Sequence, residues 1–134
     1  MLQKIEHLGI AVLNAPQSVR LFEKLFNTTC YKKEEVASEH VITHFFQVGS
    51  NKVELLEATS PDSAIAKFIE KRGEGLHHVA FAVEDILAEI NRLKEEGFVF
   101  INDTPKDGAD NKLIAFLHPK STNGVLIELC QEKR

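Results

Sequence analysis

The sequence lacks a long apolar run, an excess of positive charge and clustered cysteines, and each absence excludes a class of protein. No stretch reaches roughly 18 uninterrupted apolar residues, so we expect no transmembrane helix and no membrane partner. The net charge is -4 and the two signs are interspersed, which argues against a nucleic-acid partner because phosphate binding needs a concentrated basic face. With 134 residues, 43% of them hydrophobic, the chain predicts a single domain (1-134) with a real core.

The two cysteines, Cys30 and Cys130, stand far apart and form no C-x-x-C pair. We interpret both as small apolar side chains. Because no secretory apolar segment follows Met1, the sequence favours a reduced, cytoplasmic compartment.

One order of elements, strand, helix and three strands, is predicted twice along the chain. Alternating and helical apolar spacing indicates the following elements. In the first half we expect strands at 5–12, 29–36, 40–48 and 52–58 with a helix after Asn14 and Pro16, and in the second half strands at 77–84, 98–101, 113–118 and 124–130 with a helix from Asp85 to Gly97. A linker helix at about 60–74, with Ser60 as N-cap, Pro61 at its first position and Gly73 at its end, separates module one (about 1–59) from module two (about 75–134).

The two modules also match residue by residue. HLGIAV from His7 aligns with HVAFAV from His78, and the strand closing each module carries a carboxylate, Glu54 in KVELLE and Glu128 in VLIELC. This correspondence indicates an internal repeat in which each half supplies one histidine and one glutamate.

Strand alternation predicts that these four side chains share one face. If the apolar neighbours of each residue pack against the helices, then the histidines and glutamates point to the opposite side of the sheet. Two such half-sheets related by pseudo-twofold symmetry would give two nitrogen and two oxygen ligands, a set suited to a divalent transition metal with positions left for substrate. We therefore predict His7, Glu54, His78 and Glu128 as metal ligands.

Simpler interpretations exist for single residues. A lone strand histidine is usually a hydrogen-bonded structural residue, which is how we interpret His77, His40, His44 and His118. Two carboxylates alternating with apolar residues are typical of the solvated face of a sheet. The coincidence of four matched residues across the repeat favours the metal site over that interpretation.

The motifs IEHLGIAV, PDSAIAKFIEKRGEGLHHVAFAVEDI and IAFLHPKSTNGVLIEL resemble the vicinal oxygen chelate superfamily (glyoxalase/bleomycin resistance/dioxygenase), and within it the methylmalonyl-CoA epimerase family. The resemblance spans nearly the whole chain. It implies an α+β fold of two pseudo-symmetric βαβββ modules forming a curved mixed sheet around a metal-binding cleft. The same four residues map to the family's metal ligands, although some members have Gln where Glu54 stands.

The reaction implied by this resemblance interconverts (2R)- and (2S)-methylmalonyl-CoA, a step of propionate metabolism, through an enolate. One divalent metal ion per chain, Co, Ni, Mn or Zn, would act as Lewis acid. Inversion needs two acid/base groups, and Glu128 is the first candidate. For the second, some relatives have a glutamate where Thr43 stands; Thr43 is a poor base, here a candidate substrate contact, so Glu39, His40 or a metal-bound water is considered instead. His44 has the wrong parity.

The implied CoA thioester is anionic and should favour basic residues near the site. Candidates are Lys71, Arg72, Lys106, Lys112 and Lys120, with Lys120 preferred, although each also fits a solvated surface residue. We expect segment 106–112 to be a loop. Family resemblance and exposed edge strands favour a homodimer.

Three other functions fit parts of the pattern. A glyoxalase-type lyase or isomerase acting on a hemithioacetal would use a very similar ligand set, so only the surrounding motifs separate it from an epimerase. A metal-free small-molecule binding module would have no reason to keep four ligands in register. A ring-cleaving dioxygenase would use two histidines and one carboxylate, in a longer chain.

Overall fold

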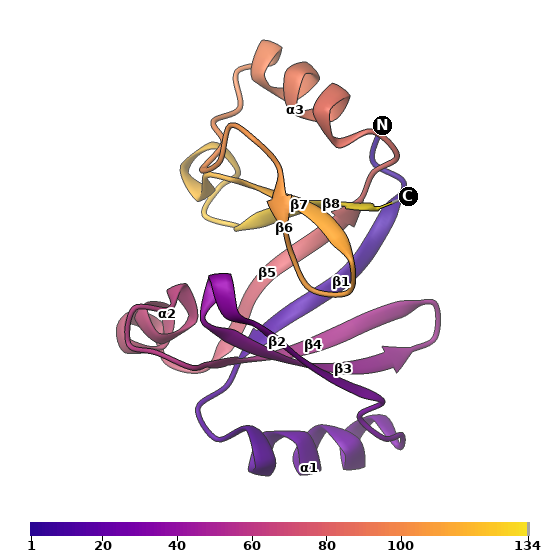
Figure 1. Cartoon of the computed structure of the whole chain (residues 1–134), viewed down its shortest axis with the longest axis vertical. Helices are drawn as coiled ribbons and strands as arrows, with labels where there is room; N and C mark the ends of the chain where they lie inside the picture. The colour runs from indigo at the N-terminus through magenta and orange to yellow at the C-terminus, as the bar shows by residue number, and fades with distance from the viewer. Residues whose placement is uncertain (134) are drawn as a thin grey trace. The chain divides into compact units, whose positions relative to one another are not determined.

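The structure, a computed structural model, describes residues 1–133 and divides the chain into two compact units. The first unit spans His7–His77, and the second combines Met1–Glu6 with the chain from His78 onward. Each unit contributes a set of hydrogen-bonded strands and at least one covering helix (Figure 1).

The first unit has the order strand, helix and three strands, followed by a second helix. Its elements are β1 (Lys4–Ala11), α1 (Ala15–Phe26), β2 (Lys32–Val36), the 3-10 helix η1 (Ala37–Glu39), β3 (Val41–Val48), β4 (Asn51–Ala58) and α2 (Ala64–Arg72). The strands lie in the order β2-β3-β4-β1, with β1 parallel to β4 and the other neighbours antiparallel. Gly49 turns the chain between β3 and β4 at a φ of +61°, a conformation that glycine adopts without a steric penalty.

Two helices cover opposite faces of these strands. The carboxamide of Asn14 caps α1 by accepting a hydrogen bond from the Gln17 amide at 3.1 Å, and Figure 1 shows α1 running along one side of the sheet. The α1 face packs around Val12, Ala15, Val19, Phe22, Phe26, Phe46, Val53 and Leu55. The α2 face packs around Ala11, Leu56, Ile65, Phe68 and Ile69. Because Leu55 and Leu56 are consecutive strand residues, they point to different faces.

The second unit repeats the same order. Its elements are β5 (Gly75–Ala82), α3 (Ile86–Glu95), β6 (Lys106–Asp107), β7 (Lys112–Leu117), the 3-10 helix η2 (Pro119–Ser121) and β8 (Ile127–Glu132). The strands lie in the order β5-β8-β7-β6, with β5 parallel to β8 and the other neighbours antiparallel. The start of the chain joins this unit, since the Gln3 amide donates to the Ala82 carbonyl at 2.9 Å.

The core of the second unit lies between α3 and its strands. Asp85 caps α3 by accepting a hydrogen bond from the Ala88 amide at 3.1 Å. The buried cluster contains Val83, Ile86, Ile90, Leu93, Phe100, Ala115, Leu117 and Leu129. Full burial of a side chain such as Leu129 contributes about 1.5–3 kcal/mol.

The α+β class and both strand-helix-strand-strand-strand orders are confirmed, whereas three local predictions are wrong: the cap of α2, the strand at 98–101 and the loop at 106–112. The N-cap of α2 is Ser63, whose hydroxyl accepts from the Ile65 amide at 3.1 Å, because Ser60 instead closes a turn by accepting from the Asp62 amide at 3.1 Å. The predicted strand at 98–101 is reduced to a single bridge between Phe100 and Leu117.

The edge strand of the second unit is instead β6, inside the segment predicted to be a loop. It pairs with β7 through Lys106–Ile114 and Asp107–Leu113. Gly108 follows it directly, and an added Cβ there would meet the Ile114 side chain at 2.8 Å, so close packing favours glycine at this position. None of the helices in the described part of the chain is long and apolar enough to cross a membrane.

Candidate metal centre

His7 and Glu54 form a buried pair in the first unit. His7 lies on β1, and Glu54 lies on the adjacent strand β4, opposite Gly9. The His7 Nδ1 atom is 3.2 Å from the Glu54 Oε2 atom, and the two side chains are 6% and 7% exposed. A carboxylate as buried as that of Glu54 is costly without a hydrogen-bonded or ionic partner. His7 is such a partner.

His78 and Glu128 form the corresponding pair in the second unit. His78 lies on β5, and Glu128 lies on β8 opposite Ala80. The His78 Nε2 atom is 3.2 Å from the Glu128 Oε1 atom, with exposures of 5% and 7%. The ring of Phe116 meets the His78 ring edge-on at a centroid distance of 5.8 Å, which fixes one side of the imidazole.

Strand alternation explains why both carboxylates escape the apolar cores. Val53 and Leu55 flank Glu54 and belong to the α1 cluster. Leu129 and Ile127 flank Glu128 and pack in the α3 cluster. Glu54 therefore points to the sheet face opposite α1, and Glu128 points to the face opposite α3, as the alternation predicts.

The donor chemistry of each pair fits a divalent transition metal. Ligand bonds of about 2.0–2.2 Å at tetrahedral or octahedral angles place neighbouring nitrogen and oxygen ligands about 2.8–3.6 Å apart. The observed separation of 3.2 Å in both pairs lies within that range. Each half thus presents one imidazole and one carboxylate spaced as neighbouring ligands of one ion.

Thr43 and His44 of β3 occupy opposite faces. Thr43 is 1% exposed and aligns with Leu56, so it lies on the Glu54 face. His44 lies on the other face, where its Nε2 atom is 3.1 Å from a Glu57 carboxylate oxygen. His44 is therefore a structural residue with the wrong parity for the site, in agreement with the sequence argument.

Glu39, His40 and His118 lie outside the strands, whereas His77 lies on β5. Glu39 lies in η1, and His40 follows it with a φ of 54°. His118 accepts a hydrogen bond from the Lys120 amide through Nδ1 at 3.1 Å, which makes it a cap of η2. His77 lies edge-on to Phe68 at 5.0 Å, and burial lowers its pKa to about 4.

The predicted basic candidates do not share one element. Lys106 and Lys112 align with Ile114 and Glu132, which places both on the Glu128 face of the second unit. Lys112 forms an ion pair with Glu132, in which its ammonium is 3.2 Å from a carboxylate oxygen. Lys120 is exposed in η2, and Lys71 and Arg72 occupy the last turn of α2.

Sequence reasoning missed a charged pair on the Glu54 face of the first unit. Lys32 aligns with Phe45, and Glu34 aligns with Thr43. The Lys32 ammonium is 3.3 Å from the Glu34 carboxylate and 5.1 Å from the centre of the Phe45 ring. Alternation along residues 32–36 was the available signal, but it does not give the register between β2 and β3.

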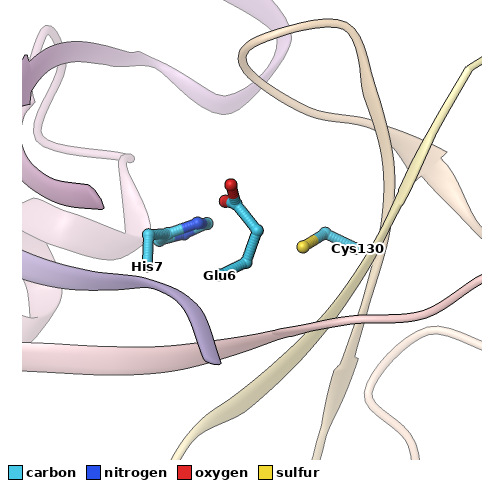
Figure 2. A group of neighbouring side chains, drawn as sticks. All are labelled: Glu6, His7 and Cys130. Atoms are coloured by element: carbon cyan, nitrogen blue, oxygen red, sulfur yellow. The ribbon is translucent and has the colours of Figure 1, made fainter. Parts of the chain in front are cut away.

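Glu6 was also missed. Its carboxylate and the Cys130 thiol, both buried, lie within 4.8 Å of one another, and Figure 2 shows the thiol pointing toward Glu6. Cys130 also donates to the Phe81 carbonyl at 3.5 Å and does not form a disulfide. Both residues line a polar cavity of about 410 Å³ that also includes Lys112.

The chain is similar to known proteins over almost its full length. A model described as Glyoxalase/Bleomycin resistance protein/Dioxygenase superfamily matches residues 6–116. The chain is 37% identical to the uncharacterised protein YqjC of Bacillus subtilis, covering 98% of this chain and 94% of that protein. It is 36% identical to the ethylmalonyl-CoA/methylmalonyl-CoA epimerase of Cereibacter sphaeroides, covering 98% and 99%.

Solved structures extend this similarity to the fold. A variant of methylmalonyl-CoA epimerase from Streptomyces coelicolor, in complex with 2-nitronate-propionyl-CoA, superposes with a TM-score of 0.94. The two sequences are 31% identical, and the match covers 98% of this chain and 96% of that one.

Proposed function

This chain belongs to the Glyoxalase/Bleomycin resistance protein/Dioxygenase superfamily, and we propose that it is a metal-dependent epimerase interconverting (2R)- and (2S)-methylmalonyl-CoA. The observation that carries the proposal is the buried histidine–glutamate pair, which occurs in both units with the same 3.2 Å separation. Relatives named methylmalonyl-CoA epimerase, matched over nearly their whole length, support the choice of substrate.

The metal ligands in this proposal are His7, Glu54, His78 and Glu128. A bound divalent ion would supply Lewis-acid stabilisation of negative charge on the thioester oxygen. Two imidazoles and two carboxylates suit Co, Ni, Mn and Zn alike, since none of these ions requires a ligand type that the set lacks. The ligand chemistry therefore supports one divalent ion per chain and does not select among the four metals.

Epimerisation requires a proton to leave C2 on one face and to return on the other. Breaking the C2–H bond sends its electron pair into an enolate, whose charge must be stabilised. Glu128 would exchange a proton with C2 on one face, since its carboxylate can hold a proton at either oxygen. Its burial and its pairing with His78 would fix its orientation during that transfer.

Substrate contacts follow from the same faces. Lys106 lies on the Glu128 face with its ammonium 6.0 Å from the centre of the Phe116 ring, where it would attract the anionic substrate. Exposed Lys120 would meet the phosphates of CoA. Thr43 would contact the acyl group through its hydroxyl. The homodimer and the cytoplasmic location stay predictions.

The main competing function is a glyoxalase-type reaction on a hemithioacetal. The same ligands would serve this reaction equally well. Epimerisation forms an enolate and the hemithioacetal reaction forms an enediolate, and a bound metal ion would stabilise the negative charge of either one. The matched epimerase relatives favour the CoA thioester.

Solvent deuterium incorporation at C2 of (2R)-methylmalonyl-CoA, followed by NMR, tests the proposal. Metal-loaded protein should incorporate deuterium and form the (2S) epimer, and EDTA-treated protein should do neither. If protein that binds metal tightly gives no exchange but converts a hemithioacetal, the epimerase assignment is wrong.

A further inference from the structure

The proposed reaction leaves one role without a residue. An epimerase needs an acid/base group on each side of C2, and Glu128 of the second unit can serve only one side. Because the first unit supplies the other two proposed metal ligands, a second acid/base group would lie on its Glu54 face.

Strand register limits the carboxylates on that face. The row through Glu54 contains Gly9, Phe45 and Lys32, and the next row contains Leu56, Thr43 and Glu34. Along β1 to β4, all within the described residues, Glu34 is the one carboxylate on this face besides Glu54.

Glu34 is placed at a distance that leaves room for a small acyl group. Adjacent strands lie about 4.8 Å apart and residues rise about 3.3 Å along a strand, so the Glu54 and Glu34 Cα positions are about 12 Å apart. Both side chains point to the same side of the sheet. Thr43 stands between them in sequence register, and its small side chain leaves the space that a longer residue would fill.

Lys32 holds Glu34 in this orientation. Its ammonium is 3.3 Å from the Glu34 carboxylate and lies over the Phe45 ring, directly opposite Glu54 in the register. The Glu34 side chain is 30% exposed, so it can exchange protons with solvent between turnovers. A positioned carboxylate with access to water meets both needs of an acid/base group.

The other titratable candidates of the first unit fit this role less well. His44 points to the opposite face and contacts Glu57. Glu39 and His40 lie in and after η1, away from the strand rows. The Thr43 hydroxyl is far too weak a base to remove a proton from C2.

We infer that Glu34 is the second acid/base residue of the epimerase, acting on the face of C2 opposite Glu128; the inference rests on the proposed function. In one direction, the C2–H bond breaks, its proton passes to the Glu34 carboxylate and its electron pair forms the enolate. The Glu128 carboxylic acid then delivers its proton to the other face of C2, forming the new C–H bond. Each turnover moves one proton from one glutamate to the other, and exchange with water restores both.

The test uses the metal-loaded protein in deuterated water with each epimer supplied separately. Glu34→Gln removes the acid/base group and keeps the shape of the side chain. Glu35→Gln is the matched control, because Glu35 is exposed and aligns with Ile42 on the other face. Metal content and thermal unfolding midpoints establish that each variant is folded and loaded.

We expect Glu34→Gln to slow epimerisation about 10²–10⁴-fold. It should still exchange the C2 proton of one epimer without inversion, because Glu128 remains, and Glu35→Gln should match the wild type. If a folded, metal-loaded Glu34→Gln epimerises at the wild-type rate, Glu34 is not the second base although the proposed function stands. If the wild type exchanges neither epimer, the proposed function fails and this inference fails with it.

Discussion

The two units of the molecule share their ligand pair and differ at their edge strands. In both, a histidine and a glutamate on neighbouring parallel strands lie 3.2 Å apart and almost fully buried. In both, a lysine lies over a phenylalanine beside the glutamate, Lys32 over Phe45 and Lys106 over Phe116. The histidine–glutamate pair and the neighbouring phenylalanine are thus the features that both units share.

The edges have diverged. In the first unit the edge strand β2 runs over five residues and carries Glu34 next to Lys32. In the second unit the edge strand β6 has only two residues, Lys106 and Asp107, and Asp107 forms an ion pair with Lys133. Under the proposed function, the edge strand of the first unit supplies the proton carrier Glu34, and the edge strand of the second unit supplies the cation Lys106.

The largest expected effect is a difference in kcat between variants of Glu128 and Glu54. Glu128→Gln should lower the kcat of epimerisation about 10²–10⁴-fold, because an amide cannot carry the proton. Glu54→Gln should keep activity within about tenfold of the wild type, since its amide oxygen can still ligate. Steady-state kinetics with measured metal content checks both. Equal losses would mean that the two units play equivalent roles.

The histidines should be equivalent where the glutamates are not. His7→Ala and His78→Ala should each weaken metal binding by at least about 100-fold, because loss of a direct ligand exceeds the effect of losing its supporting partner. Titration calorimetry with Co²⁺ or Zn²⁺ measures this. His118→Ala, at an exposed position, is the control and should bind metal normally. Loss in only one of the two histidine variants would contradict a shared site.

The two lysines should differ in the kinetic constant that they affect. Lys106→Met should raise KM for the CoA thioester about tenfold, because it removes a charge-assisted contact, and the difference should shrink at high salt. Lys32→Met should lower kcat instead, since it releases Glu34. Initial rates over a range of ionic strength test this pair of outcomes, and the reverse assignment would refute the division of roles between the edges.

The smallest effect concerns the residue before each histidine, Glu6 in one repeat and His77 in the other. Burial lowers the pKa of His77 to about 4, so the unfolded chain binds a proton more readily. The stability that His77 contributes is present above about pH 6.5 and is lost as the pH falls toward 4.

His77→Leu should therefore flatten the acid side of the stability curve by about 1–3 kcal/mol relative to the wild type. Urea unfolding of EDTA-treated proteins between pH 4 and about 7 measures this. His118→Leu serves as the exposed control. An unchanged slope in His77→Leu would show that burial does not govern this histidine.

The sequence predicted the parts of the molecule that depend on local periodicity. Alternation predicts the orientation of Glu54 and Glu128 correctly because each is flanked on its own strand by core residues. Those neighbours point to the core, so the glutamate between them points to the opposite face. The cap of α2 was misplaced by three residues because Ser60 and Ser63 both offer a hydroxyl, and only the turn geometry decides between them.

Features that depend on pairing between strands were not predictable. Glu34 lies on the Glu54 face because η1 sets the register of β2 against β3, and composition does not encode the geometry of such a connection. The edge strand β6 has only two residues, too few for an alternating pattern. The segment at 98–101 is apolar because Phe100 packs into the α3 core. This apolar pattern resembles that of a strand, so the sequence wrongly predicted one.

The division of β1 between the two units has a consequence for synthesis of the chain. Residues up to Glu6 belong with residues that follow His78, and the Gln3 amide pairs with Ala82. At translation rates of about 5–20 residues per second, Ala82 is synthesised roughly 4–15 s after Gln3. The pairing of Gln3 with Ala82 therefore forms later in synthesis than the pairing of β1 with β4.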